Sequence, residues 1–374
     1  MTRRTVLFND LTPGDDELSR EIEAAIRRVV ASARYVLGPE VEAFEDEFCR
    51  ALGLEHGVGV ASGTDALSLS LLALGIEPGD EVITSPLTAA FTALAISRVG
   101  ARPVFADVEE DFLTISPESV EAHITPRTKA IIPVHLYGNA CAMDALMTLA
   151  ERHSLDLVED ACQAHGGRYR DQPLGGLGQA GAFSFYPTKN LGALGDGGFV
   201  ATRDAELAAS LKRSRNGGQS SRYVHETLGF NSRLDELQAA VLRAKLPHLE
   251  RGNERRREIS ARYETELEGT DLELVSPRDH TVSARHLFVV KAPARDALMT
   301  RLNERGVQSL IHYPIPVHLQ PAYRAVHEEG QLVQGEGSCP VAEAAASSIL
   351  SLPLYPSLQD VDVDTVIAAL REVS

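Results

Sequence analysis

The sequence predicts an α/β fold with two domains: a large one on a mostly parallel central sheet flanked by helices, and a smaller C-terminal α+β one. Short apolar segments alternate with helical segments through the first half of the chain, the pattern of a parallel sheet with helices on both faces. The length of 374 residues suits about two domains. We place the large domain at 1–247, with N-terminal helices, and the small domain at 248–374.

The elements of the first domain follow from apolar periodicity and turn residues. A helix over 39–52 places Val41, Phe44, Phe48 and Leu52 on one face. The expected strands are HGVGVAS (56–62), EVIT (81–84), PVFADV (103–108), KAIIPVHL (129–136), LDLVED (155–160), GAFSFY (181–186) and GFVATR (198–203). The expected helices between them cover 63–75, 88–99, 116–124 and 143–153.

The second domain is expected to begin within a long charged helical stretch at 234–268, which Pro247 interrupts. HLFVV (286–290) predicts a strand and RDALMTRLNERG (295–306) a helix. The segment HYPIPVHLQPAY (312–323) is rich in proline and histidine and predicts a loop.

Composition excludes several classes of function. The net charge of −17 argues against nonspecific binding to nucleic acid or to an anionic membrane. The N-terminus lacks the apolar region of a secretory signal, and the apolar runs are far shorter than a membrane helix needs. Four scattered cysteines, Cys49, Cys141, Cys162 and Cys339, fit a reducing cytoplasm. Lys212, Arg213 and Arg215 form a local basic cluster that could still meet an anionic small ligand.

Two segments place complementary groups after strands. LVEDACQAHGG (157–167) contains Asp160 at a strand end, and FSFYPTKNLGALGDGG (183–198) contains Lys189 among glycines. Ligands bind at the carboxyl ends of parallel strands. An amine that forms a Schiff base and a carboxylate that pairs with a pyridinium nitrogen are the minimum equipment for pyridoxal 5′-phosphate chemistry. A surface lysine and a strand-end acid that caps a helix are the alternative roles of these residues.

A phosphate site is expected between the first strand and the next helix. Ser62, Gly63 and Thr64 lie there, where free N–H groups and the helix dipole favour an anion. Ser62 would equally serve as a helix cap. Ser184 is a second candidate for the phosphate, and it is otherwise an ordinary strand hydroxyl.

Other polar residues carry weaker signals. Asn231 and Arg233 precede a helix, where asparagine is usually a cap. His135, His312 and His318 form no metal-ligand signature, so no metal site is expected. His135 is most simply a strand-end histidine bonded in the core or near the cofactor, and the loop with His312 and His318 could be purely structural.

Taken together, these segments resemble the DegT-type (StrS-like) sugar aminotransferase family, pyridoxal phosphate enzymes of the aspartate-aminotransferase fold. The resemblance covers nearly the whole chain. The blocks that carry it, in order, are LGPEVEAFEDEF, GVASGTDALSLSLLALGIEPGDEVIT, PVHLYG, VEDACQAHGG, FSFYPTKNLGALGDGG, GFNSRLDELQAAVLRAKL and HYPIPVHLQPAY.

The resemblance implies a role for each matching residue. Lys189 would be the catalytic lysine bound to the cofactor aldehyde, Asp160 would pair with the ring nitrogen, and Gln163 would contact the phenolate oxygen. Gly63, Thr64 and Ser184 match phosphate positions. Asn231 matches a position that reaches the phosphate of the neighbouring subunit, which implies a homodimer with a shared active site. His318, with Tyr313 in the same loop and Tyr186 before the lysine, is expected to face the sugar.

The sequence departs from the family pattern in two places. Ala89 occupies a position that is commonly an aromatic stacked on the cofactor ring, with Phe91 two residues later, and NSR replaces the frequent NYR.

Lysine at 189, rather than histidine, favours amino transfer over dehydration. The favoured substrates are L-glutamate and a keto sugar nucleotide, with a dTDP-3-keto-6-deoxyhexose as the specific expectation. A cyclitol ketone or an aminobenzoate-type synthesis is the alternative, followed by a noncatalytic cofactor-binding regulator.

Overall fold

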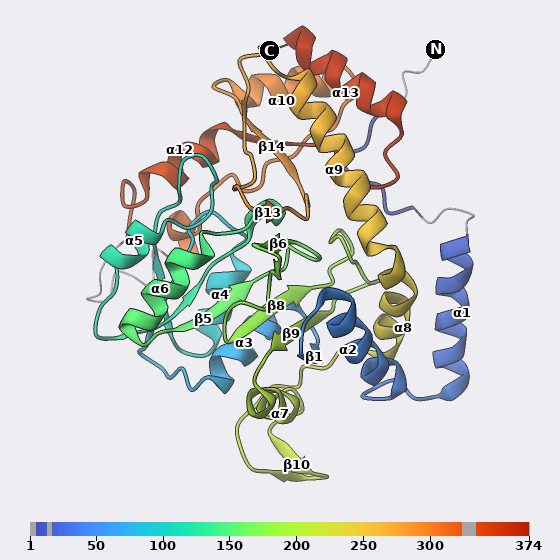
Figure 1. The fold of residues 1–374 in the computed structure, drawn as a ribbon, viewed down its shortest axis with the longest axis vertical. Coiled ribbons are helices and arrows are strands. Elements are labelled where there is room, and N and C mark those ends of the chain that lie inside the picture. Colours follow the sequence, from blue (N-terminus) through green and yellow to red (C-terminus); the bar gives the residue numbers. More distant parts are fainter. Residues whose placement is uncertain (1–4, 13–16, 324–333, 374) are drawn as a thin grey trace.

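The centre of the computed structural model is a seven-stranded sheet (Figure 1), and the structure describes residues 5–12, 17–323 and 334–373. In spatial order the strands are β1 (His56–Val60), β9 (Gly198–Thr202), β8 (Ala180–Ser184), β5 (Asp156–Asp160), β4 (Thr128–Ile132), β2 (Glu81–Thr84) and β3 (Arg102–Phe105). β9 runs antiparallel to both of its neighbours, and the other neighbouring pairs are parallel. The predicted α/β fold with a mostly parallel sheet is therefore confirmed.

Alternate residues of each strand face opposite cores, as the two-residue period of a strand requires. Ile83, Leu157 and Phe199 belong to a cluster that also includes residues of α2 (Pro39–Leu52), α5 (Pro117–Ala122), α6 (Met143–His153) and α8 (Glu236–Lys245). Val82, Val158 and Val200 belong to a second cluster, with residues of α3 (Gly63–Ala73), α4 (Phe91–Arg98) and α7 (Ala205–Ser214). The sheet is thus buried on both faces.

A smaller sheet organises the C-terminal part. Its strands are β12 (Glu273–Leu274), β14 (Phe288–Lys291) and β15 (Ile349–Leu352). The surrounding helices are α9 (Leu249–Glu266), α10 (Arg295–Glu304), α12 (Pro340–Ser348) and α13 (Asp360–Val373). Val6 belongs to one apolar cluster with buried residues of α9, α10, α13, β14 and β15, and it bridges to Val307. The N-terminal segment therefore packs against the C-terminal part. The domain division at 247/248 stays a proposal. Val6 precedes this division in the sequence but packs with the C-terminal part.

The remaining elements are short or peripheral. α1 (Glu17–Ser32) packs against α8, and the hairpin of β10 (Gln219–Ser221) and β11 (Val224–His225) projects from the body beyond α7 (Figure 1). A three-stranded sheet joins β13 (Thr281–Val282), β6 (Arg168–Tyr169) and β7 (Gln172–Pro173). Single 3₁₀ turns are η1 (Leu136–Gly138), η2 (Leu246–His248) and η3 (Val317–Leu319).

Several predicted elements differ from the observed ones in their limits. The strand expected at 129–136 ends at Ile132, because Pro133 has no N–H for the ladder. The helix expected at 88–99 begins only at Phe91. The stretch at 234–268 is divided by η2, which contains Pro247, into α8 and α9.

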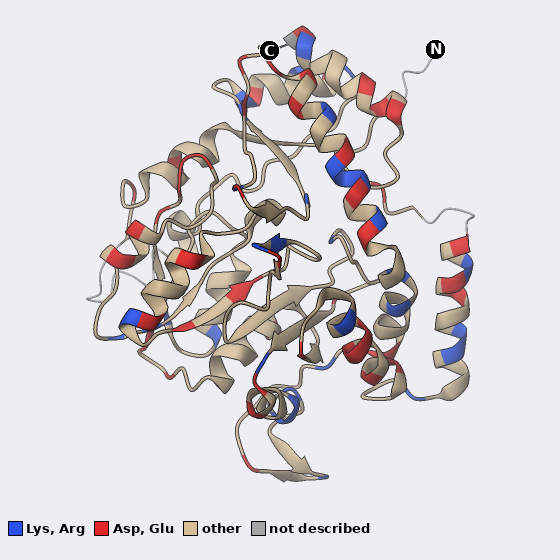
Figure 2. Ribbon diagram, viewed as in Figure 1, with Lys and Arg blue, Asp and Glu red and all other residues tan. Residues whose placement is uncertain are grey.

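Charged residues lie mainly on the helices, and acidic and basic residues alternate along α9 (Figure 2). Within α9, Arg255 pairs with Glu258 and Arg257 with Glu250. Arg262 reaches Asp360 and Asp364 at α13. Among the described helices, none combines the length and the apolar character needed to cross a bilayer.

Replacing Glu236 by glutamine is expected to lower the free energy of unfolding by about 1–3 kcal/mol. The Glu236 side chain is 1% exposed and accepts from the N–H groups of Gly38, Glu40 and Val41, at 2.8–2.9 Å. Glutamine would turn an amide N–H₂ toward one of these donors and leave it unsatisfied. Chemical denaturation should show a lower midpoint with an unchanged slope. An equal loss in the exposed control Glu268→Gln would contradict this role.

Candidate active site

The candidate site lies at the carboxyl edge of the central sheet. β1, β5 and β8 run in the same direction, and their carboxyl ends lead to Ser62, Asp160 and Ser184. Lys189 follows β8 in a tight loop. Asn190 anchors this loop by donating to Asn253 Oδ1 at 2.8 Å and to the Ala284 carbonyl at 2.7 Å. The sheet and α9 together therefore fix the position of the lysine.

Asp160 is held by two hydrogen bonds. It is 6% exposed, and its Oδ2 accepts from the Thr92 hydroxyl at 2.8 Å. Its Oδ1 accepts from the backbone N–H of Cys162 at 3.2 Å. A buried carboxylate fixed in this way has a defined orientation toward a ligand. Asp160 therefore does not cap a helix. Its side chain accepts hydrogen bonds from Thr92 and from the backbone turn that directly follows β5.

Lys189 is half-buried and lies close enough to Asp160 to interact with its carboxylate electrostatically. Burial lowers the pKa of Lys189, while the nearby Cys162 and Asp160 oppose the shift. A lowered pKa leaves a larger fraction of the amine neutral than for a surface lysine, and only the neutral amine is a nucleophile. The alternative role of a solvated surface lysine does not fit this environment.

An anion cradle forms where α3 begins. Ser62 caps the helix by accepting from Asp65 N at 3.1 Å. The N–H groups of Gly63 and Thr64 have no acceptor within the helix, and none is recorded for them in the described part of the chain. A Cβ on Gly63 would lie 2.8 Å from the Cβ of Ser184, so β8 brings Ser184 directly against this turn. The helix end and two hydroxyl groups suit a phosphate.

Gln163 has a fixed orientation at the same edge. It is 5% exposed, its Oε1 accepts from the N–H of Tyr137 at 2.7 Å, and its Nε2 donates to the Tyr313 hydroxyl at 3.2 Å. The second N–H of the amide remains for another acceptor. Gln163 thus links the 312–323 loop, through Tyr313, to the segment that carries Asp160.

A cavity of about 480 Å³ opens beside the lysine loop. Tyr186 and Thr188, which precede Lys189, line it together with the following residues of the N-terminal segment and the C-terminal part: Phe8, Asn9, Leu11, Arg256, His286, Leu287, Gln308, Leu310, His312 and Leu354. Burial lowers the pKa of His312 to about 4 and that of His286 well below its ordinary value, and Lys189 adds to both shifts. These two imidazoles are therefore neutral at physiological pH.

Three predicted residues do not line this cavity. His318 is fully buried and bonded to Glu343 at 2.9 Å. Asn231 is exposed and forms a backbone bridge with Asn216. Arg233 donates to the side chain of that same Asn216 at 2.9 Å.

The basic cluster predicted at 212–215 is divided by its environment. Arg215 is buried and donates to Glu45 and to the Gly59 carbonyl, and Lys212 lies 3.7 Å from the same carboxylate. Arg213 is exposed. Glu45 thus already neutralises part of this cluster.

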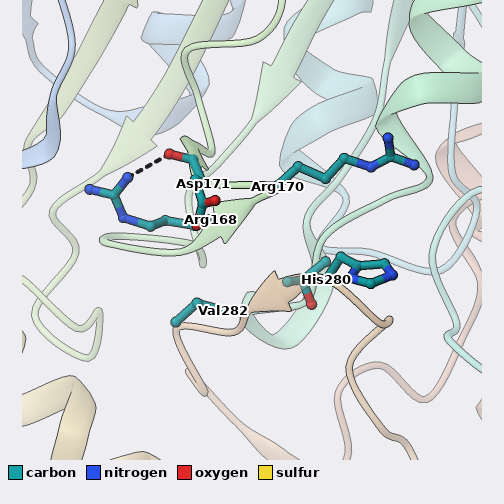
Figure 3. A pocket seen from close by; sticks show the side chains of 6 residues that line it. Arg168, Arg170, Asp171, His280 and Val282 are labelled. Carbon is teal, nitrogen blue, oxygen red and sulfur yellow. Dashed lines mark hydrogen bonds between the residues drawn. The ribbon is translucent and has the colours of Figure 1, made fainter.

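A second pocket, of about 590 Å³, lies at the sheet of β6, β7 and β13 (Figure 3). Its arginines point away from one another in the view. Arg168 donates to the Asp171 carbonyl at 2.7 Å, and Arg170 pairs with Asp144 at 2.6 Å. Both cations are thus engaged within the chain, and the groups needed for amine chemistry lie at the other cavity.

Several contributors escaped prediction from the sequence. The role of Thr92 was missed because the helix expected to begin at 88 begins only at Phe91. Arg256 was missed because it is one of five arginines between 251 and 262, and the sequence does not distinguish it from the others. His135, in contrast, has the core role considered for it: its Nε2 lies 3.0 Å from Glu159, which also accepts from Gly175, Leu177 and Gly178 N–H groups.

Known proteins resemble this chain over nearly its whole length. The chain is 50% identical over 370 residues to a dTDP-3-amino-3,4,6-trideoxy-alpha-D-glucose transaminase of Streptomyces venezuelae, covering 98% of this chain and 96% of the relative. It is 51% identical over 368 residues to the erythromycin biosynthesis sensory transduction protein EryC1 of Saccharopolyspora erythraea, covering 98% and 99%.

Solved structures share the whole fold. The S. venezuelae DesV structure, in complex with a ketimine intermediate, superposes with a TM-score of 0.94 at 50% identity, covering 99% of this chain and 98% of that one. The NtdA structure from Bacillus subtilis, with bound cofactor PMP, gives 0.89 at 32% identity, covering 99% and 85%. The model of the DegT/DnrJ/EryC1/StrS aminotransferase family matches residues 16–371, and the chain belongs to this family.

Proposed function

We propose that this aminotransferase transfers an amino group from L-glutamate to a keto sugar nucleotide and uses pyridoxal 5′-phosphate as its cofactor. The observation that carries the proposal is the position of Lys189 beside the buried Asp160, with an anion cradle at the start of the neighbouring α3. When bound, the cofactor supplies an aldehyde for imine formation and a ring that withdraws electrons from the reacting carbon.

The residues present fit this cofactor. Gly63, Thr64 and Ser184 would hold its phosphate, because they combine a helix N-terminus with hydroxyl donors. Asp160 would face the ring nitrogen and hold a proton there, and the free N–H of Gln163 would reach the phenolate oxygen.

Lys189 has two tasks in this reaction. With the cofactor bound, its neutral Nζ would hold the aldehyde. The same Nζ would accept the proton from the donor α-carbon in the first half-reaction and would deliver a proton to the carbon that carried the sugar ketone in the second. The lowered pKa of Lys189 supports both tasks, since a general base works best when its pKa lies near the working pH.

We further propose a homodimer in which Asn231 reaches the partner's phosphate site. Asn231 is exposed in the single chain and lies after the projecting β10–β11 hairpin. That segment exposes large apolar side chains: Tyr223 is 78% exposed and Leu228 is 88% exposed. Exposed apolar groups on a projecting arm are typical of an interaction surface.

The acceptor we propose is a dTDP-linked 3-keto-6-deoxyhexose, whose product would serve the biosynthesis of an antibiotic-type metabolite or a surface polysaccharide. Support comes from the 50% identity with a transaminase named for a dTDP-3-amino-trideoxyglucose. Tyr186 and Tyr313, near the lysine loop, would contact the sugar. We place the reaction in the cytoplasm, in keeping with four unpaired cysteines.

The test uses the purified enzyme loaded with pyridoxal phosphate. L-Glutamate alone should convert the cofactor absorbance to that of the pyridoxamine form, and a keto sugar nucleotide should restore it. If an inosose restores the cofactor absorbance and no sugar nucleotide does, the acceptor is a cyclitol ketone and not a sugar nucleotide. A cofactor spectrum that glutamate leaves unchanged would support the noncatalytic regulator instead.

Replacing Thr92 by valine is expected to lower kcat/KM about tenfold, the effect of losing one hydrogen bond of about 1.4 kcal/mol to a charged group. The variant removes the donor to Asp160 Oδ2 and keeps the shape of the side chain. Thr92→Ser should restore the rate, because it restores the hydroxyl. Unchanged kinetics and an unchanged cofactor dissociation constant in Thr92→Val would refute a positioning role.

A further inference from the structure

Arg256 differs from the neighbouring arginines of α9. Arg255, Arg257 and Arg262 are partly exposed and pair with carboxylates. Arg256 is 5% exposed, and its recorded partners are two backbone carbonyls: Nη1 donates to His286 O at 3.2 Å and to Leu354 O at 2.7 Å. Among the described residues, its partners include no carboxylate, so within that part of the chain Arg256 is a buried cation without a counter-ion.

This cation lines the cavity beside the catalytic lysine. A short series of contacts connects the two residues: Arg256 donates to the His286 carbonyl, and His286 Nδ1 lies 2.9 Å from Asn190 Oδ1, next to Lys189 in the chain. Asn253, one helical turn before Arg256, also accepts from Asn190. The guanidinium and the lysine loop are thus held in one hydrogen-bonded framework.

The burial of Arg256 costs free energy that its two carbonyl contacts only partly offset. Removing a charge from water is expensive unless an opposite charge accompanies it. Burial lowers the pKa of Arg256 to about 10, which leaves the group charged at neutral pH. An anion that enters the cavity would supply the missing charge, and Nε and Nη2 retain donors for it, since both recorded bonds use Nη1.

We propose that Arg256 binds a carboxylate of the amino donor and so positions its α-carbon at Lys189. The inference rests on the proposed transamination and assigns a donor subsite within it. A planar guanidinium matches a carboxylate in a bidentate arrangement. The rest of the lining supports this choice over a diphosphate: His286 and His312 are neutral, and five residues, Phe8, Leu11, Leu287, Leu310 and Leu354, are apolar. One arginine among apolar groups suits a single carboxylate better than two phosphates.

The experiment titrates the enzyme loaded with pyridoxal phosphate with glutarate, a dicarboxylate without an amino group, and separately with dTDP, by isothermal calorimetry. The variants are Arg256→Gln, Arg256→Lys and the matched control Arg251→Gln. Arg251 lies on the same helix, is exposed and contacts His248. The cofactor absorbance reports whether the site is intact in each variant.

Arg256→Gln is expected to raise the glutarate dissociation constant at least about tenfold and leave dTDP affinity within about twofold. Arg256→Lys should retain part of the glutarate affinity, and Arg251→Gln all of it. Unchanged glutarate binding in Arg256→Gln overturns the proposal, as does a loss of dTDP binding instead, which would place a phosphate there. If Arg256→Gln fails to fold, an unchanged dissociation constant in Arg256→Lys also overturns it.

The same measurements distinguish a failure of the Arg256 subsite from a failure of the proposed transamination. A wild-type enzyme that binds glutarate through Arg256 but does not convert its cofactor with glutamate retains the subsite and refutes the proposed transamination. A wild-type enzyme that transaminates glutamate but shows no dependence on Arg256 retains the function and refutes the subsite.

Discussion

Replacing Lys189 by alanine is expected to lower the aminotransferase rate by about 10³-fold or more, because the variant removes both the amine that binds the aldehyde and the base that moves the proton. The half-buried position and lowered pKa of this amine fit both tasks. Since the pKa is lowered, the neutral amine forms at a lower pH than for an ordinary lysine, so the rate should rise with pH through a pKa below about 10.4. Stopped-flow measurement of each half-reaction against pH gives both quantities.

The control for Lys189 is Lys129→Ala, which removes an exposed lysine on β4 and should leave the rate unchanged. External methylamine is expected to restore part of the proton-transfer rate in Lys189→Ala, since it replaces the lost base. A variant that keeps the wild-type absorbance band of a lysine adduct, or a rate within tenfold of wild type, would contradict the assignment.

Replacing Asp160 by asparagine is expected to lower the rate by about 10²-fold or more, within the range of a lost proton-holding group. Asparagine is nearly the same size, and its oxygen can still accept from Thr92, so the fold should be retained. It lacks the negative charge that keeps a proton on the ring nitrogen, and without that proton the ring withdraws electrons poorly. The cofactor absorbance and the rate of conversion by glutamate measure both effects.

The matched control lies on the same strand. Asp156 begins β5, and burial raises its pKa, so its charge is not favoured by the fold. Asp156→Asn is therefore expected to keep the rate of the wild-type enzyme. Equal losses in Asp156→Asn and Asp160→Asn would indicate damage to the strand and refute a specific role for Asp160.

The sequence predicts the strands and their strand-end residues well because buried parallel strands are continuous apolar runs. Asp160, Gly63 and Ser184 come together for this reason: each lies at the carboxyl end of a strand or just after it. Their roles toward the cofactor came from the ordered blocks of the family, since a strand-end acid alone has several possible uses.

Other features depend on tertiary contacts that local patterns do not contain. The contact of Thr92 with Asp160 depends on where α4 begins, and the isolation of Arg256 depends on which side of α9 faces the cavity. The burial of His318 against Glu343 joins segments 25 residues apart. The pairing of Arg215 with Glu45, 170 residues apart, is likewise invisible to the local spacing that indicated a basic cluster.

Borohydride reduction of the enzyme incubated with pyridoxal phosphate, followed by peptide mapping, tests the central claim most directly. The account predicts one stable pyridoxyl label, on the peptide that contains Lys189, and none in Lys189→Ala. A label on a different lysine, or an unlabelled protein, would contradict it.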